Sequence, residues 1–207
     1  MKKIMLEQKI WFSNKASIKL TSLEPVFNNL LAVHLAYILG EKGKDYPYWY
    51  KERPHIGFLA AAVWLSGGTA LEEYQAGRKK RRLGRCDLWI RTNKVAFECE
   101  AKRLWLNLEK DTEELRQKIG KKLDSAAKEV ENLEKGKGLA LCFAMPSIHC
   151  KSKKRDTLDK LIYDLIESAK QIPKLHALVW IGFKKGTKPM GDPYLFPGLL
   201  LAIKEVK

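Results

Sequence analysis

Residues 84–105, with the sequence GRCDLWIRTNKVAFECEAKRLW, predict a β-hairpin around which the rest of the chain is organised. Apolar and polar residues alternate over 86–91 and again over 95–102, as they do in strands with one buried face. Residues 92–94, Thr-Asn-Lys, interrupt this alternation and supply a polar turn. The stretch therefore reads as two antiparallel strands, each with an apolar face toward the core.

The hydrophobic pattern also restricts how the two strands pair. A connection of two residues would set Asp87 opposite Glu98, and one of four residues would set Asp87 opposite Glu100. Both registers stack the apolar faces, whereas a slip of one residue would turn every side chain to the other face. Both also gather the same polar side chains on the opposite face: Asp87, Glu98, Glu100 and Lys102. Three carboxylates and one amine are therefore expected together.

Such a cluster needs a physical reason, because like charges on neighbouring strands repel each other. A divalent cation supplies the missing positive charge, and carboxylate oxygens are the ligands that Mg²⁺ prefers. The alternative is a solvent-facing sheet on which Lys102 merely neutralises Glu100. The position of Asp87 on the same face of a plausible hairpin favours the metal site.

These residues resemble the motif of the PD-(D/E)XK nuclease superfamily, whose members have a restriction-endonuclease-like fold. Asp87 matches the aspartate of the family, although Cys86 stands in the place of its proline, and 100–102, Glu-Ala-Lys, match its (D/E)XK element. The resemblance covers roughly residues 70–147. It implies that Asp87 and Glu100 hold Mg²⁺ or Mn²⁺.

The resemblance implies further roles for residues near the hairpin. The Ala101 backbone carbonyl becomes an additional metal ligand, and Lys102 orients or deprotonates the attacking water. The family often carries a glutamate on the helix before the catalytic strands, for which Glu73 is the preferred match and Glu72 the reserve. A solvated helix end is the plainer interpretation of both glutamates.

Glu98 shares the face of the expected metal ligands and has two alternative roles. It could reach the metal or a second ion, or it could pair with Arg85 or Lys102 beside the site. The residue types alone leave both roles open.

The second global feature is a formal net charge of +15, from 39 Lys and Arg against 24 Asp and Glu. Such a field favours a polyanionic partner, most commonly nucleic acid. A basic loop leading into Asp87 is expected to hold the phosphate backbone through Arg78, Lys79, Lys80, Arg81, Arg82 and Arg85. An anionic membrane is the alternative, but no basic amphipathic helix with an aromatic face accompanies this loop.

The rest of the chain alternates helical and strand patterns. Helices are expected over residues 22–39, 56–73, 109–133 and 157–171, strands over 138–145, 177–183 and 199–203, and a loop over 186–198. Residues 1–21 are left unassigned. The pattern predicts a single α/β domain over residues 1–207, a mixed central sheet flanked by helices, with a nuclease-like core over about 56–147.

Cysteine usage and hydropathy bear on the compartment. The four cysteines show no CxxC spacing, which argues against a zinc site or a disulfide framework and favours a reducing cytoplasm. No run of about 18 apolar residues predicts a transmembrane helix. The start of the sequence, MKKIMLEQKIWF, lacks the features of a secretory signal. A cytoplasmic protein without a membrane partner is expected.

Together these features predict a Mg²⁺-dependent endonuclease that hydrolyses phosphodiester bonds, with DNA as the expected substrate. A non-catalytic nucleic-acid-binding module on the same fold is the main alternative. A protein–protein scaffold or a different carboxylate–lysine enzyme leaves the positive charge unexplained. A homodimer is compatible with the resemblance, because many nucleases of the superfamily cut two strands as dimers. The residues leave open whether the substrate is DNA or RNA, and whether it is duplex, single-stranded or branched.

Overall fold

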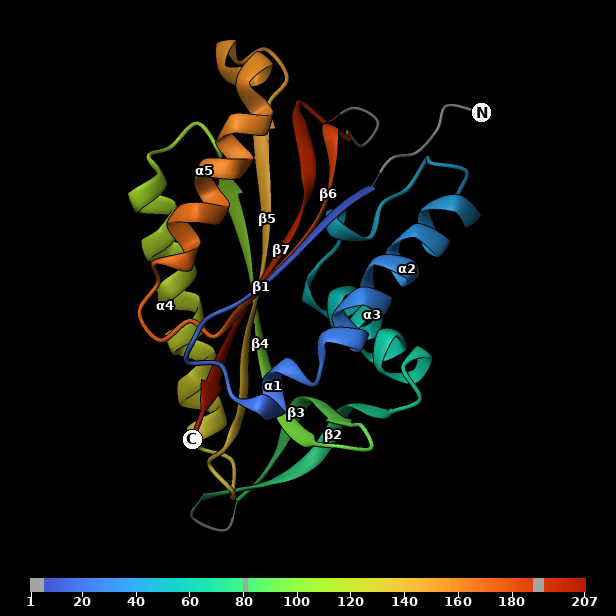
Figure 1. Cartoon of the computed structure of the whole chain (residues 1–207), viewed down its shortest axis with the longest axis vertical. Helices are drawn as coiled ribbons and strands as arrows, with labels where there is room; N and C mark the ends of the chain where they lie inside the picture. The colour runs from blue at the N-terminus through green and yellow to red at the C-terminus, as the bar shows by residue number, and fades with distance from the viewer. Residues whose placement is uncertain (1–5, 80–81, 188–191) are drawn as a thin grey trace.

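The computed structural model describes residues 6–79, 82–187 and 192–207, and a seven-stranded sheet runs through its centre (Figure 1). The strands are β1 (Leu6–Phe12), β2 (Thr69–Arg78), β3 (Arg82–Arg91), β4 (Ala96–Asn107), β5 (Gly138–His149), β6 (Ala177–Thr187) and β7 (Tyr194–Val206). Their order across the sheet is β1-β6-β7-β5-β4-β3-β2. Among these described strands, β4 and β5 pair in parallel and the other neighbours pair antiparallel, so the sheet is mixed.

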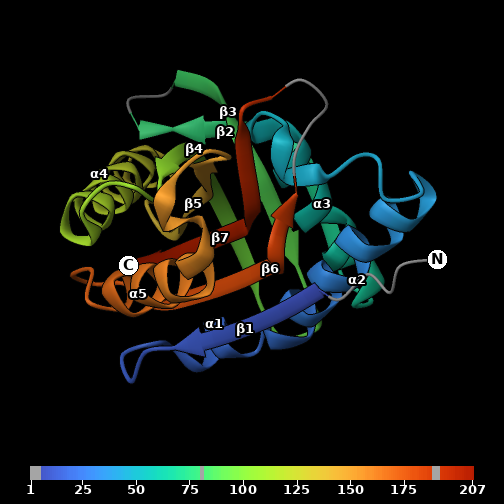
Figure 2. The same cartoon turned by 90° about the horizontal axis from the view of Figure 1, so that it is seen from above.

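Helices cover both faces of this sheet. They are α1 (Ile18–Thr21), α2 (Glu24–Gly40), α3 (Glu52–Leu65), α4 (Thr112–Glu131) and α5 (Leu158–Lys170), with short 3-10 turns at Pro47–Trp49 and Lys153–Thr157. Figures 1 and 2 show α2 and α3 on one side of the sheet and α4 and α5 on the other. The predicted α/β fold class is confirmed. None of the described helices is long and apolar enough to cross a bilayer.

Strand β5 explains why residues 138–145 are almost continuously apolar. Leu141 and Phe143 belong to the core beneath α2 and α3, whereas Cys142 and Ala144 belong to the core beneath α4 and α5. All four side chains are buried. A strand covered by helices on both faces has no solvent-facing side, so both alternating sets of side chains are apolar.

Helix α4 carries the apolar stripe that the sequence predicts. Its N-cap is Asp111, whose side chain accepts a hydrogen bond from the Glu113 N–H at 2.8 Å. The residues of the stripe are all buried, six of them within α4 and the seventh, Leu133, just after its end: Leu115, Ile119, Leu123, Ala126, Ala127, Val130 and Leu133. This stripe packs α4 against the sheet, so residues at the edge of the stripe can reach β4.

The helix predicted over residues 56–73 is wrong in its second half, because α3 ends at Leu65 and β2 begins at Thr69. Two glycines make this change of direction. Gly67 adopts a left-handed conformation, with φ +73°. A Cβ atom at Gly68 would lie 2.5 Å from the Arg91 carbonyl oxygen, so only glycine lets the chain pass so close to β3.

The predicted basic loop is also different, because its residues form the end of a β-hairpin. Strands β2 and β3 pair from Thr69 with Arg91 to Arg78 with Arg82. Lys80 and Arg81 lie outside the described residues. In Figure 1 this hairpin, hereafter the β2–β3 arm, lies at the lower end of the sheet. The arm carries Asp87 together with several of the predicted phosphate contacts.

The remaining predicted elements are present with shifted ends. The segment predicted as a loop, 186–198, contains the ends of β6 and β7, and residues 188–191 lie outside the described part of the chain. The unassigned N-terminal segment contains β1 and α1. Strand β1 forms one edge of the sheet by pairing antiparallel with β6.

Two histidines are buried in the core beneath α2 and α3. His34 is 1% exposed and His55 is 0% exposed. The His34 ring centroid lies 4.8 Å from that of Phe58, and the His55 ring stacks on Phe143 at 5.4 Å. Burial is the main cause that lowers the pKa of His34 to about 4 and that of His55 to about 3.

We expect these two histidines to make the fold sensitive to mild acid. In the unfolded chain each takes up a proton near pH 6.5, whereas in the folded chain protonation waits until about pH 4 and 3. The stability that these two histidines contribute is therefore present above about pH 6.5 and is lost as the pH drops toward 4, by up to about 1.4 kcal/mol per pH unit for each histidine. Urea midpoints measured across this range test it. His55→Phe should make the urea midpoint less dependent on pH, whereas the control, His149→Phe, should not. A wild-type urea midpoint that does not change with pH would contradict the expectation.

Candidate metal centre

The β3–β4 hairpin adopts the register with four residues, 92–95, between the paired strands. Leu88 pairs with Cys99, so Asp87 and Glu100 occupy the next position along the two strands. The described ladder between β3 and β4 stops there, because β3 continues along β2 while β4 continues along β5. The two carboxylates therefore lie where the sheet divides.

A third carboxylate joins them from α4. Oxygen atoms of Asp87, Glu100 and Glu129 all lie within 4.8 Å of one another. Glu100 is buried, and Asp87 and Glu129 are partly buried. Asp87 Oδ2 accepts a hydrogen bond from the Ala101 N–H at 2.8 Å, which holds the Asp87 carboxylate across the gap between the strands. The arrangement places three oxygen ligands around one point.

The electrostatic environment of Glu100 disfavours its charge. Burial, followed by the neighbouring Asp87 carboxylate, raises the pKa of Glu100 to about 8, and Glu129 adds to the effect. Arg78 opposes it through an ion pair in which Nη2 lies 3.0 Å from Glu100 Oε1. The protonated form of the Glu100 carboxyl group is therefore more favoured than in an exposed glutamate, although Arg78 stabilises the ionised form. A bound cation would favour its ionised form.

Lys102 belongs to the same cluster and pairs with Glu129, its Nζ lying 2.7 Å from Glu129 Oε2. Burial acts to lower the pKa of Lys102, but the hydrogen bond to Glu129 and the charge of Asp87 outweigh it, so the pKa is raised and the amine is an ammonium. The alternative of an exposed sheet on which Lys102 neutralises Glu100 is wrong. Glu100 is buried, and Arg78 is its ion-pair partner.

Neither Glu73 nor Glu72 lies on a helix, so that part of the prediction is wrong. Both belong to β2, and Glu73 has a positive φ of 46°. Glu73 forms ion pairs with Arg53 and with Arg85, the latter at 3.2 Å. The Glu72 carboxylate lies against Gly57 of α3. Among the described residues, neither glutamate belongs to the carboxylate cluster of the centre.

Two acidic residues near the centre are not predicted by the sequence pattern. Glu129 lies beside Val130 at the edge of the buried stripe of α4, which is the signal that could have found it. Glu52 lies in the first turn of α3. Burial raises the pKa of Glu52, with Lys102 lowering it and Asp87 raising it, so the Glu52 carboxyl lies within electrostatic reach of the cluster.

Glu98 has partners other than the predicted Arg85 or Lys102. Glu98 Oε1 accepts a hydrogen bond from the Tyr74 hydroxyl at 3.0 Å and lies 3.6 Å from Lys135 Nζ. Of the two alternatives for Glu98, a pairing beside the site is therefore present, but with Lys135 in place of Arg85 or Lys102. Its other oxygen, Oε2, is buried without a hydrogen-bond partner among the described residues.

No family model, curated protein or solved structure matches this chain. The resemblance to PD-(D/E)XK nucleases consequently rests on residue types and their arrangement alone. The arrangement consists of Asp87 and Glu100 at the dividing point of β3 and β4, with Lys102 two positions further along β4.

The predicted phosphate contacts divide into three groups. Arg78 turns inward to Glu100, and its guanidinium also donates to the Arg85 carbonyl oxygen. Lys79 and Arg85 are exposed, and the Lys79 backbone N–H donates to the Asn132 carbonyl oxygen at 2.9 Å, which fastens the β2–β3 arm to the end of α4. The remaining three are Arg82, which begins β3, and Lys80 and Arg81, which lie outside the described residues.

Proposed function

We propose that this protein is a metal-dependent nuclease that hydrolyses phosphodiester bonds, with DNA as the expected substrate. One observation carries the proposal: three carboxylates and an ammonium meet where β3 and β4 separate. A carboxylate cluster alone would suit many metal sites. Lys102 adds a positive charge beside the expected ion, which suits an anionic substrate such as a phosphodiester.

The donor set fits a hard divalent cation. All three side chains offer oxygen, and their ligand atoms lie within 4.8 Å of one another, so small side-chain movements would bring them to the Mg²⁺–oxygen distance of about 2.0–2.1 Å. Asp87, Glu100 and Glu129 would hold Mg²⁺ or Mn²⁺. Burial and the neighbouring Asp87 carboxylate raise the pKa of Glu100 to about 8, so a bound cation would stabilise its ionised form. The Ala101 carbonyl remains a predicted further ligand.

When bound, Mg²⁺ would polarise the scissile phosphate and make an attacking water more acidic. Lys102, held by Glu129 at 2.7 Å, would orient that water and offset the negative charge on the phosphate. Glu129 and Glu52 keep Lys102 protonated, because both raise its pKa. The exposed basic side chains of the β2–β3 arm would hold the phosphate backbone without reading its sequence.

The proposal is tested by incubating the protein with plasmid, linear and branched DNA in Mg²⁺, Mn²⁺ or EDTA. We expect cleavage in the presence of either metal and none in EDTA. Binding without cleavage in every metal condition would contradict the proposal and favour the non-catalytic nucleic-acid-binding module instead.

The β2–β3 arm should supply affinity without sequence specificity. Replacing Lys79, Lys80 and Arg81 by alanine is expected to weaken binding similarly for all duplex sequences. It should also flatten the slope of log K against log salt by about 0.9 for each phosphate that the variant no longer neutralises. Arg78 is kept, because it pairs with Glu100. Filter-binding titrations at several salt concentrations measure both effects.

A matched control removes three lysines from α4 and α5: Lys121, Lys122 and Lys160, all of them exposed. This variant has the same net charge as the arm variant but keeps the arm intact. If both variants show the same salt slope as the wild-type protein, the arm does not contact the phosphate backbone.

A further inference from the structure

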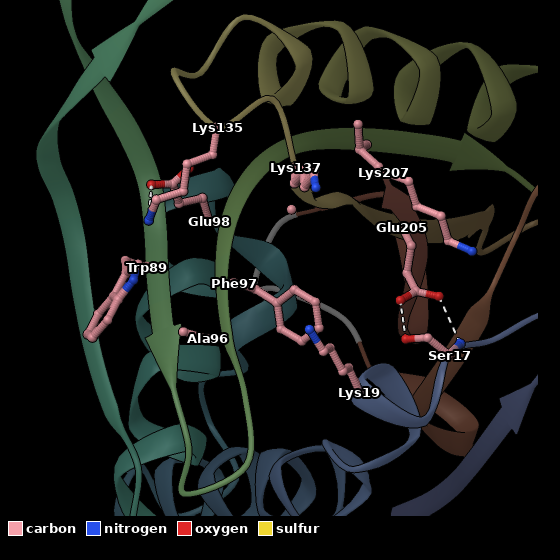
Figure 3. Close-up of a pocket in the computed structure, with 12 residues that line it drawn as sticks. Ser17, Lys19, Trp89, Ala96, Phe97, Glu98, Lys135, Lys137, Glu205 and Lys207 are labelled. Atoms are coloured by element: carbon pink, nitrogen blue, oxygen red, sulfur yellow. Dashed lines mark hydrogen bonds and ion pairs between the residues drawn. The ribbon is translucent and has the colours of Figure 1, made fainter.

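A cleft of about 730 Å³ opens at one end of the sheet, against the β3–β4 hairpin whose strands also carry Asp87 and Glu100 (Figure 3). Its walls come from the β3–β4 hairpin, the residues before β5, the end of β7 and the start of α1. Figure 3 shows Lys19, Lys137 and Lys207 around the open space, with Trp89 and Glu98 on the side of the hairpin. None of these lysines was among the predicted site residues.

The cleft continues the metal centre along the same strands. Trp89 and Glu98 form a directly opposed pair in the β3–β4 ladder and both line the cleft. Trp89 is two residues from Asp87, and Glu98 is two residues from Glu100. Residues two apart in a strand share a face and lie about 7 Å from each other. A nucleic-acid strand with a phosphate at the metal centre would therefore have its next nucleotides at Trp89 and Glu98, on the hairpin side of the cleft.

The cleft presents unpaired positive charge. Its two acidic side chains have partners: Glu205 accepts hydrogen bonds from the backbone N–H (2.9 Å) and the hydroxyl of Ser17, and Glu98 Oε1 accepts one from Tyr74 and lies 3.6 Å from Lys135 Nζ. Within the part of the chain that the structure describes, three of its lysines form no ion pair: Lys19, Lys137 and Lys207. Free ammonium groups around a hollow suit phosphate oxygens.

The cleft also presents aromatic surface. Trp89 and Phe97, both partly buried, are among its lining residues, and they lie on opposite faces of the β3–β4 hairpin. An aromatic ring can stack on any base whose face is free, which is the case in a single strand and not inside a duplex. Lysines combined with such rings are the features of a groove for single-stranded nucleic acid.

We propose that this cleft binds a single-stranded segment of the substrate next to the cleaved bond. Trp89 stacks on an unpaired base, and Lys137 and Lys207 contact the adjoining phosphates. The substrate class is then a nucleic acid with an unpaired strand on one side of the cut, such as an overhang, a flap or a bubble. The position of the cut rests on the proposed nuclease function, whereas the binding itself does not.

Binding is tested in EDTA, where no cleavage is expected, with a fluorescent single-stranded oligonucleotide and the duplex of the same sequence. Lys137→Ala/Lys207→Ala should lower single-strand affinity by about tenfold or more and reduce the salt slope by about 0.7 for each phosphate that is no longer neutralised. The control, Lys121→Ala/Lys160→Ala, has the same net charge and should bind as the wild type does. Equal affinities for the two double variants would overturn the proposal.

Trp89 separates stacking from charge. Trp89→Ala should weaken single-strand binding by about tenfold or more, with a smaller effect on the duplex, and Trp89→Phe should retain most of the affinity. Circular dichroism confirms that each variant is folded. If folded Trp89→Ala binds the single strand as the wild type does, or loses single strand and duplex equally, the assignment of Trp89 fails.

The two proposals can fail separately. Metal-dependent cleavage together with normal single-strand binding by the Lys137→Ala/Lys207→Ala variant would refute the cleft and leave the nuclease proposal standing. Selective loss of single-strand binding in that variant, together with no cleavage by the wild-type protein in any metal, would support the cleft and refute the nuclease proposal.

Discussion

Asp87→Asn and Glu100→Gln should each abolish metal-dependent cleavage while nucleic-acid affinity stays at the wild-type value or rises. Each change replaces a carboxylate by a neutral amide of the same shape at the point where the three carboxylates meet. An amide is a weaker ligand for Mg²⁺, so the ion should bind poorly. Removing negative charge beside the substrate phosphate should not weaken binding. Cleavage of plasmid in Mg²⁺ and binding in EDTA measure the two effects independently.

Glu73→Gln is the control for this pair. Glu73 is a glutamate on the neighbouring strand β2, but it pairs with Arg53 and Arg85 and lies outside the carboxylate cluster. Cleavage by Glu73→Gln should therefore continue at close to the wild-type rate. Equal loss of binding and cleavage in folded Asp87→Asn would contradict the metal assignment.

Lys102→Ala is expected to lower the cleavage rate by about a hundredfold or more. The ammonium is held by Glu129 beside the expected ion, where it can orient water and stabilise the charge that develops on the phosphate. Mn²⁺ binding, measured by calorimetry, should survive, because an ammonium is not a metal ligand and its loss relieves repulsion of the cation. Lys102→Arg should also be slow, because a guanidinium is larger, planar and effectively always protonated.

The unfolding free energy of Lys102→Ala distinguishes a catalytic role of Lys102 from that of a purely structural ion pair. Lys102 and Glu129 are both partly exposed, so removing the pair should cost at most about 1 kcal/mol of unfolding free energy. Lys118→Ala is the matched control. It also replaces a lysine and also removes an ion pair to a glutamate of α4, in this case Glu114. A Lys102→Ala protein that cuts DNA at the wild-type rate would refute the mechanism.

The parts of the molecule that follow from local periodicity were predictable from the sequence. The β3–β4 hairpin and its face of carboxylates follow from alternation, and the buried stripe of α4 follows from helical spacing. The sequence allowed two registers, and pairing of Leu88 with Cys99 is the one with a four-residue connection. A single hydrophobic face fixes the register only to within two residues.

The other parts depend on tertiary contacts that no local pattern contains. Strand β2 looked helical because its Leu71-Glu72-Glu73 sequence continues the apolar segment before it, whereas pairing with β3 makes it a strand. Glu129 reaches the centre because α4 packs on the sheet. Glu52 was missed because the helix was expected to start at residue 56, four positions later than Glu52 itself.

The ion pair between Arg78 and Glu100 has a thermodynamic consequence. In the metal-free protein, the guanidinium and an incoming divalent cation would compete for the same carboxylate group, that of Glu100. Entry of the metal would release Arg78 at the base of the β2–β3 arm, where its charge becomes available to a phosphate. Metal and nucleic acid should then bind cooperatively, each raising the affinity of the other by the same factor, because linkage between two binding equilibria is reciprocal. Arg78 would act as an internal counter-ion of Glu100 in the metal-free protein, and the bound metal ion would take its place.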